Sequence, residues 1–138
     1  MDQLIIPEFL YIDLVEYCAE QLPKEACGLL SGNDHVIRTV WKLKNQSKSN
    51  NKFFVDQTII EKTYNEIKSK NEIVIATFHS HPTTAALPSY VDIKYHLNPN
   101  ILMIIISFKF KTPKVKCYKI SNNNYNEYPI QIKSLPLP

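Results

Sequence analysis

Two uninterrupted apolar runs constrain the fold of this chain more than any other feature of its sequence. They occupy residues 73–78 (IVIATF) and 101–106 (ILMIII) and are rich in β-branched side chains. Runs of this kind are typical of strands that are covered on both faces. A short helix is expected between them, and a strand, a helix and a strand in this order imply a parallel pair joined by a right-handed crossover. The sequence therefore predicts an α/β fold built around a mixed sheet.

The rest of the chain supplies further elements around this pair. Pro7 is well placed to open a first helix, and Asp56 is a suitable N-cap for a second one. The segments 26–32 and 36–43 are expected to pair as an antiparallel hairpin with its turn at residues 32–34. The expected elements are helices at about 7–22, 56–70 and 89–97, strands at 26–32, 36–43, 53–55, 73–78, 101–106 and 115–120, a solvated loop at 44–52, a polar turn at 121–124 and a Pro-rich tail ending at 138.

Length and composition fit one globular domain over residues 1–138, with an extended tail from about residue 122. Hydrophobic residues make up 44% of the chain and charged residues 21%, which argues against a disordered protein. The longest apolar run is far shorter than the roughly 20 residues that a membrane-spanning helix needs, so no membrane partner is expected. The first residues carry no basic segment followed by a long apolar stretch, and we therefore expect a cytoplasmic protein.

Charge and cysteine content argue against three further classes. The net charge is +3 and the basic residues are scattered along the chain, which is too weak a signal for a nucleic-acid partner. Cys18, Cys27 and Cys117 are odd in number and form no C-x-x-C pair, which argues against a disulfide framework and against a cysteine-built zinc site. We expect all three to be reduced packing residues in the core.

The segment 79–82 (HSHP) carries the strongest chemical signal. It follows the first apolar run, at the carboxyl end of a strand, where open α/β sheets place their ligands. If this segment is extended, the period of two points the imidazoles of His79 and His81 to the same side. Asp92 follows on the first turn of the expected helix, within reach of both. Two imidazoles and one carboxylate are a familiar ligand set for a catalytic zinc ion, one per chain, which keeps a position open for water.

Two more residues complete a hydrolytic site. A zinc-bound water needs a carboxylate that is not a ligand to take its proton, and Glu25 is the candidate because it lies directly before an apolar strand. Ser89 places a hydroxyl close to the expected metal, where it could donate to an oxyanion. Ser89 and Asp92 also resemble a capping box. We expect Ser89 to cap the helix, and we expect Asp92 to contribute little to capping if it binds metal.

Together these residues resemble the JAMM (MPN-plus) metalloprotease family. The family pattern is a glutamate, then His-x-His, seven residues, and Ser-x-x-Asp, and this chain matches it at every position through Glu25, His79, His81, Ser89 and Asp92. The resemblance extends from residue 25 to about residue 120. It implies a deaminase-like sandwich fold, zinc bound by the two histidines and the aspartate, Glu25 as the general base, and Ser89 as a stabiliser of the tetrahedral intermediate.

The resemblance also implies a class of substrate. Family members cut the amide bond at the C-terminus of ubiquitin-like proteins, and compact prokaryotic members process sulfur-carrier or other ubiquitin-fold proteins. We therefore expect such a protein as partner, its tail lying along an exposed strand by strand addition. The alternatives are a zinc exopeptidase acting on small peptides and a non-catalytic scaffold. A nucleobase deaminase is excluded because its P-C-x-x-C pair is missing. The oligomeric state is unknown.

Two other histidines could be mistaken for ligands of the metal site. His96 lies four residues after Asp92 and so on the same helical face, but it matches no ligand position of the family. His35 falls in the predicted hairpin and is expected to be inert. Cys27, two residues after Glu25, is expected to fill the core.

Overall fold

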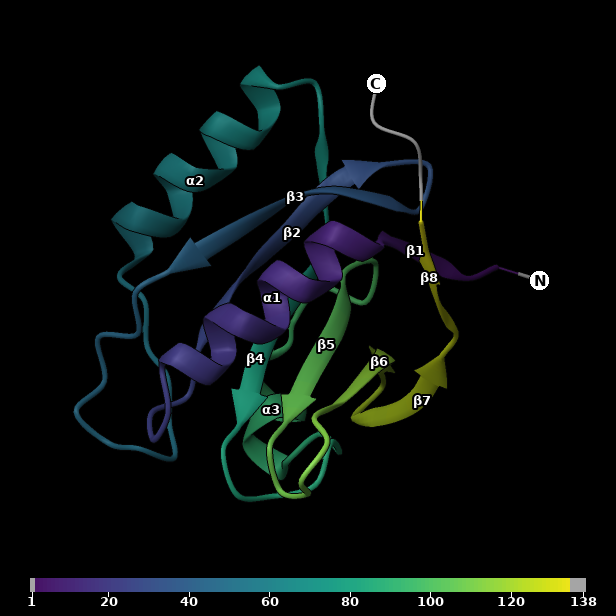
Figure 1. Ribbon diagram of the computed structural model, residues 1–138. Coiled ribbons are helices and arrows are strands. Elements are labelled where there is room, and N and C mark those ends of the chain that lie inside the picture. Colours follow the sequence, from purple (N-terminus) through teal and green to yellow (C-terminus); the bar gives the residue numbers. More distant parts are fainter. Residues whose placement is uncertain (1, 135–138) are drawn as a thin grey trace.

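The computed structural model describes residues 2–134 as one mixed sheet of eight strands with helices on both faces (Figure 1). This is the α/β fold with a mixed sheet that the apolar runs predicted. The elements are β1 (Leu4–Pro7), α1 (Glu8–Glu20), β2 (Cys27–Asn33), β3 (Val36–Leu43), α2 (Gln57–Ser69), β4 (Ile73–His81), α3 (Tyr90–Tyr95), β5 (Leu102–Ser107), β6 (Lys114–Ser121), β7 (Asn124–Tyr128) and β8 (Ile130–Lys133).

The strand order is β7-β6-β5-β4-β2-β3-β1-β8. The two apolar runs form the adjacent strands β4 and β5, and they pair in parallel as predicted, with His79 opposite Ile105. β2 pairs antiparallel with both β3 and β4. Only Pro129 separates β7 from β8, although these strands are the two ends of the order. The sheet therefore curls until its edges approach each other, and the Pro129 carbonyl accepts a hydrogen bond from the Leu4 amide at 2.9 Å.

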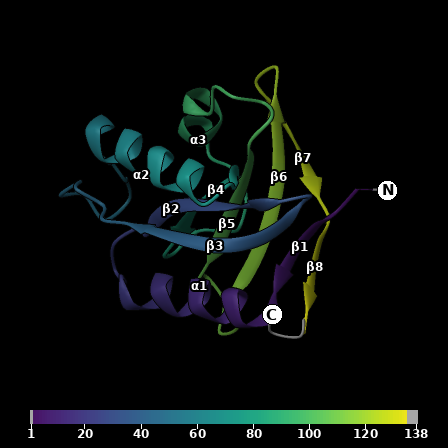
Figure 2. The same cartoon turned by 90° about the horizontal axis from the view of Figure 1, so that it is seen from above.

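The helices divide between the two faces of the sheet. α1 lies on one face and α2 and α3 on the other (Figure 2). On β5, Ile104 belongs to the cluster that packs under α1, whereas Ile105 packs with Ile93 of α3 on the opposite face. On β4, Phe78 belongs to the α1 side. Because side chains alternate along a strand, His79 projects toward the α2 and α3 side.

Several expectations about local structure were wrong. The segment 53–55 is not a strand. The polar turn is present at Asn122 and Asn123, but the residues after it form the strands β7 and β8. The short strand β1 was not predicted. The hairpin turn lies at Asp34 and His35, later than expected, and both residues have positive φ, as two-residue hairpin turns of type I′ require. The expected end of the Pro-rich tail, residues 135–138, lies outside the described residues.

Two further observations concern membrane-spanning helices and the cysteines. Within residues 2–134 no helix is long and apolar enough to cross a membrane. All three cysteines are buried and free, which confirms that they are packing residues. Cys27 packs with Leu29, Leu43 and Ile67 under α2.

Candidate metal centre

The last three residues of β4 carry the first part of the site. His79 and His81 share one face of the strand, and both are buried. Ser80 lies between them and projects to the other face, where its hydroxyl accepts a hydrogen bond from the Ala26 amide at 2.7 Å. The Ser80 amide in turn donates to the Ala26 carbonyl at 3.0 Å. The strand end is therefore tied to the residue that follows Glu25.

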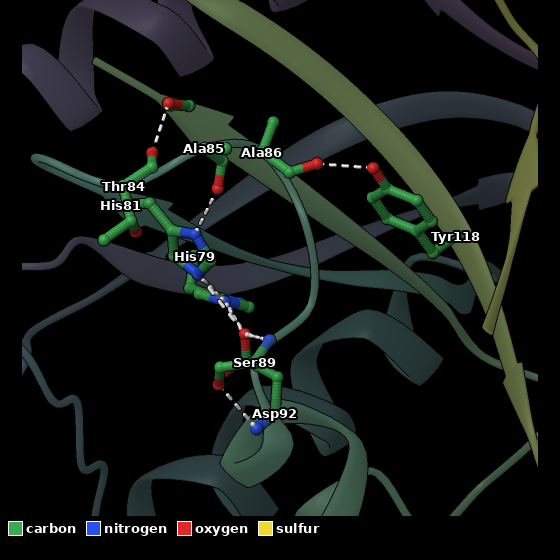
Figure 3. Close-up of polar contacts among 9 residues, drawn as sticks. His79, His81, Thr84, Ala85, Ala86, Ser89, Asp92 and Tyr118 are labelled. Atoms are coloured by element: carbon green, nitrogen blue, oxygen red, sulfur yellow. Dashed lines mark hydrogen bonds and ion pairs between the residues drawn. The ribbon is translucent and has the colours of Figure 1, made fainter. Parts of the chain in front are cut away.

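Asp92, on the first turn of α3, completes a group of three facing side chains (Figure 3). Its Oδ2 lies 3.0 Å from Nε2 of His79 and 3.2 Å from Nε2 of His81, and the two Nε2 atoms are 3.1 Å apart. Across residues 2–134, this is the one group of three or more His, Cys, Asp or Glu side chains that is close enough to share an ion. The geometry thus brings together the three predicted ligands.

The donor set and its spacing fit a zinc ion. Zinc bonds of about 2.0–2.1 Å with tetrahedral angles place neighbouring ligand atoms about 3.3 Å apart. The three observed separations of 3.0, 3.1 and 3.2 Å are close to that value. The Nδ1 of His81 donates to the Ala85 carbonyl at 2.8 Å, so the neutral ring, once Nε2 has given up its proton, presents its lone pair to the group.

The ionised form of Asp92 and the protonated form of His81 stabilise each other. Burial alone would raise the pKa of Asp92, but hydrogen bonds from His79 and His81 outweigh it and hold that pKa well below its usual range. Burial alone would lower the pKa of His81, whereas its hydrogen bonds to Asp92 and Ala85 raise it. The aspartate is therefore ionised at every physiological pH, as a metal ligand has to be.

Asp92 also caps its own helix, a role that was expected to be small if Asp92 binds metal. Ser89 Oγ accepts from the Asp92 amide at 3.0 Å, and the Ser89 amide donates to Asp92 Oδ2 at 2.9 Å. This is a complete capping box. The oxygen that faces the two histidines is the one that the Ser89 amide holds.

The loop between β4 and α3 is fixed by three side chains that each donate to one of three successive carbonyl groups (Figure 3). These donor and acceptor pairs are Ser107 Oγ to Thr84 O at 2.5 Å, His81 Nδ1 to Ala85 O at 2.8 Å, and Tyr118 Oη to Ala86 O. Ser107 and Tyr118 are buried and come from β5 and β6. Neither was predicted, since only their pairing beside β4 brings them to the loop.

Glu25 lies in the segment before β2 and is 9% exposed. Its carboxyl group is not part of the group formed by His79, His81 and Asp92. Burial raises the pKa of Glu25 to about 7; the nearby His81 lowers it and Asp92 raises it. The Glu25 carbonyl accepts from Asn45 Nδ2 at 2.8 Å, so its backbone is held on this side as well.

The two other histidines lie outside the group. His96 is the C-cap of α3, and its Nε2 donates to the Ile101 carbonyl at 2.6 Å. His35 sits in the β2–β3 turn, and its ring stacks on that of Tyr128 at 6.4 Å between centroids. Neither residue belongs to the three-ligand group.

Comparison with known proteins identifies the family of this chain. Residues 7–121 match the family described as prokaryotic homologs of the JAB domain. The chain belongs to this family. It is 25% identical over 133 residues to the CysO-cysteine peptidase of Mycobacterium tuberculosis, covering 94% of this chain and 90% of the relative. It is 26% identical over 106 residues to the desampylase of Pyrococcus furiosus, covering 77% and 75% of the two chains.

Solved structures show the same fold. A solution structure of a Desulfitobacterium hafniense protein matches with a TM-score of 0.87 at 25% identity, covering 96% of this chain and 94% of the other. The crystal structure of a JAB1/MPN domain protein from Archaeoglobus fulgidus matches with a TM-score of 0.63 at 21% identity, covering 95% and 100%. The resemblance to the JAMM and MPN proteins, and the fold that it implied, are thus confirmed.

Proposed function

We propose that this JAB-family protein is a zinc-dependent peptidase that hydrolyses the amide bond at the C-terminus of a ubiquitin-like or sulfur-carrier protein. The observation that carries the proposal is the convergence of His79, His81 and Asp92 within 3.0–3.2 Å on one face of the sheet. A cytoplasmic location remains a prediction from the sequence.

The zinc ion would be held by Nε2 of His79, Nε2 of His81 and Oδ2 of Asp92. A zinc ion with three protein ligands lowers the pKa of a bound water to about 7 and polarises a carbonyl group. Contacts within the chain hold the proposed ligands in fixed orientations. Each of two ligands is oriented by a second hydrogen bond, His81 to the Ala85 carbonyl and Asp92 to the Ser89 amide.

Glu25 is proposed as the general base. Its pKa of about 7, raised by burial, lies near the ordinary working pH, where a carboxyl group can both take a proton and give it back. It would remove the proton of the attacking water and return it to the leaving amine. Ser89 Oγ already accepts from the Asp92 amide, so its own hydrogen is available to donate to the oxyanion.

The proposed substrate class rests on the relatives. One is named as a peptidase of CysO-cysteine and another as a desampylase, and the chain covers most of each. Only a short connection separates α3 from β5, so the chain has little room there for the insertions of the ubiquitin-chain-specific members. These points support a small ubiquitin-fold substrate. A zinc exopeptidase and a scaffold remain the competing functions.

Metal analysis tests the ligand set. Protein purified without chelator should carry one zinc per chain, measured by atomic emission. His79→Ala and Asp92→Asn should lose the metal, whereas His96→Ala, the matched histidine control, should keep it. Full zinc retention in either ligand variant would remove that residue from the set, and loss in His96→Ala would change the ligand assignment.

Turnover tests the reaction. Ubiquitin-fold proteins with C-terminal extensions are incubated with the enzyme, and intact mass is followed with and without a chelator. Chelator-sensitive cleavage after the terminal glycine of the ubiquitin fold, abolished in Glu25→Gln while zinc is kept, is the expected result. Cleavage of small peptides alone would favour the exopeptidase, and an absence of zinc would favour the scaffold. An active Glu25→Gln would mean that another group is the base.

A further inference from the structure

One aromatic side chain outside the JAMM pattern contacts the metal centre. The ring of Phe53 stacks on the imidazole of His79, with 5.0 Å between centroids and 25° between planes. His79 is 1% exposed and Phe53 is 42% exposed, so the phenyl ring separates one face of the imidazole from solvent. Offset aromatic pairs at this distance are attractive, and they restrict the rotation of the rings that they join.

No strand holds Phe53 in place, because the segment 52–56 is irregular. The side-chain amide of Asn45 holds this segment. Its Oδ1 accepts from the Phe54 amide at 3.0 Å, and its Nδ2 donates to the Lys52 carbonyl at 2.9 Å. Asn45 therefore bonds to the residues on both sides of Phe53 and fixes where that ring can lie.

The same amide reaches the proposed base. Asn45 Nδ2 also donates to the Glu25 carbonyl at 2.8 Å, and Oδ1 also accepts from the Ser47 amide at 2.9 Å. These bonds use both donors and both lone pairs of the side chain, which is 9% exposed. A buried amide with every bond made is a rigid junction, because losing any one partner leaves a buried polar group unpaired.

We infer that Phe53 is a positioning residue for the imidazole of His79 and that Asn45 fixes Phe53 in this role. The inference rests on the proposed function in one respect, which is that His79 binds the metal. Phe53 orients His79 by packing on its ring, as hydrogen-bonded partners orient the other two ligands. Asn45 also binds the backbone of Glu25. The Phe53 ring, and with it His79, therefore keeps a fixed position relative to Glu25.

Metal affinity and the metal spectrum test this inference. Zinc affinity is measured by chelator competition, and cobalt(II) is substituted so that its visible absorption reports the ligand geometry. Phe53→Ala and Phe53→Leu should weaken zinc binding about 10-fold, the lower end of what supporting contacts to ligands cost, and should alter the cobalt spectrum. Phe53→Tyr keeps the ring and should restore both. Phe54→Ala, the matched neighbour at 60% exposure, should match the wild type.

Asn45→Ala should show the same change in spectrum, with the exposed Asn51→Ala as its control. Phe53 lies in a half-exposed loop, so its variants should fold even if Asn45→Ala does not, which circular dichroism checks. Phe53→Ala with wild-type zinc affinity and cobalt spectrum would overturn this inference and leave the proposed function standing. A wild-type protein that binds neither metal would overturn both.

Discussion

Replacing Glu25 by Gln should stabilise the metal-free protein at neutral and alkaline pH. Burial raises the pKa of Glu25 from 4.5 to about 7, so the folded chain keeps a proton that the unfolded chain releases between those values. The unfolded state therefore binds fewer protons in this window, and the free energy of unfolding falls as pH rises through it. Glutamine has the same shape and does not titrate, so the variant loses this dependence.

The size of the effect follows from the shift. Between about pH 5 and about pH 8, a pKa change from 4.5 to about 7 removes about 2.5 kcal/mol of unfolding free energy, and a change half as large removes about 1 kcal/mol. The unfolding free energy of Glu25→Gln minus that of the wild type should increase by this amount over the same range. Other titrations, including those of His81 and Asp92, are common to both proteins and largely cancel in the difference.

Urea unfolding with a chelator present measures this difference at a series of pH values. Glu61→Gln, the same substitution at an exposed glutamate on α2, is the matched control for the loss of a carboxylate. A difference between Glu25→Gln and the wild type that does not change with pH would refute the reasoning. It would mean that Glu25 is solvated and is not the buried carboxyl group proposed as the base.

Three further predictions concern the surroundings of the site. Tyr118→Phe removes the donor to the Ala86 carbonyl, and it should cost about 1 kcal/mol of unfolding free energy and weaken zinc binding; unchanged values in thermal denaturation and chelator competition would contradict this. Gly28→Ala places a Cβ 2.1 Å from the Trp41 carbonyl oxygen between β2 and β3, so it should cost about 1–3 kcal/mol or more in urea unfolding, and a variant as stable as the wild type would contradict it. Burial raises the pKa of Cys18 and of the other two cysteines to about 12, so a thiol reagent should label them only as fast as the protein unfolds; rapid labelling of the native protein would show an accessible thiol.

The centre of the sheet could be predicted from sequence because its strands are buried on both faces. The apolar runs at 73–78 and 101–106 carry that requirement locally, and they became β4 and β5. The structure extends β4 through His81, so His79 and His81 lie on the same face of the strand, as the prediction required. Helix boundaries also followed from local chemistry, since the Asp56 side chain accepts from the Thr58 amide at the start of α2.

The outer strands could not be predicted for the opposite reason. β7 has the sequence NYNEY and is mostly exposed, so neither apolar content nor burial marks it. It is a strand because β6 supplies its hydrogen-bond partners. Conversely, Phe53, Phe54 and Val55 have high strand propensity but form no strand. The side chain of Asn45 and the backbone amide of Gln46 supply hydrogen bonds to this segment in place of a ladder.

The candidate ligands could be recognised because their spacing is local, whereas two of the side chains that hold the surrounding segments are distant in sequence from their partners. Tyr118 is separated by 32 positions from the carbonyl that it holds, and Ser80 by 54 positions from the Ala26 amide. Nothing in the neighbourhood of either residue signals such a partner. Only the strand order β6-β5-β4-β2 brings each of these residues next to its partner.

Asp92 was expected to have a small capping role if it binds metal. That expectation treated the carboxylate oxygen as able to serve one partner. An oxygen of an ionised carboxylate has two acceptor sites, so Oδ2 can take the Ser89 amide and still face the histidines. The capping box then has a second consequence, because the bonds that start α3 also set the direction of the candidate ligand. In this family member, the hydrogen bonds of the helix terminus also hold one side of the candidate metal centre.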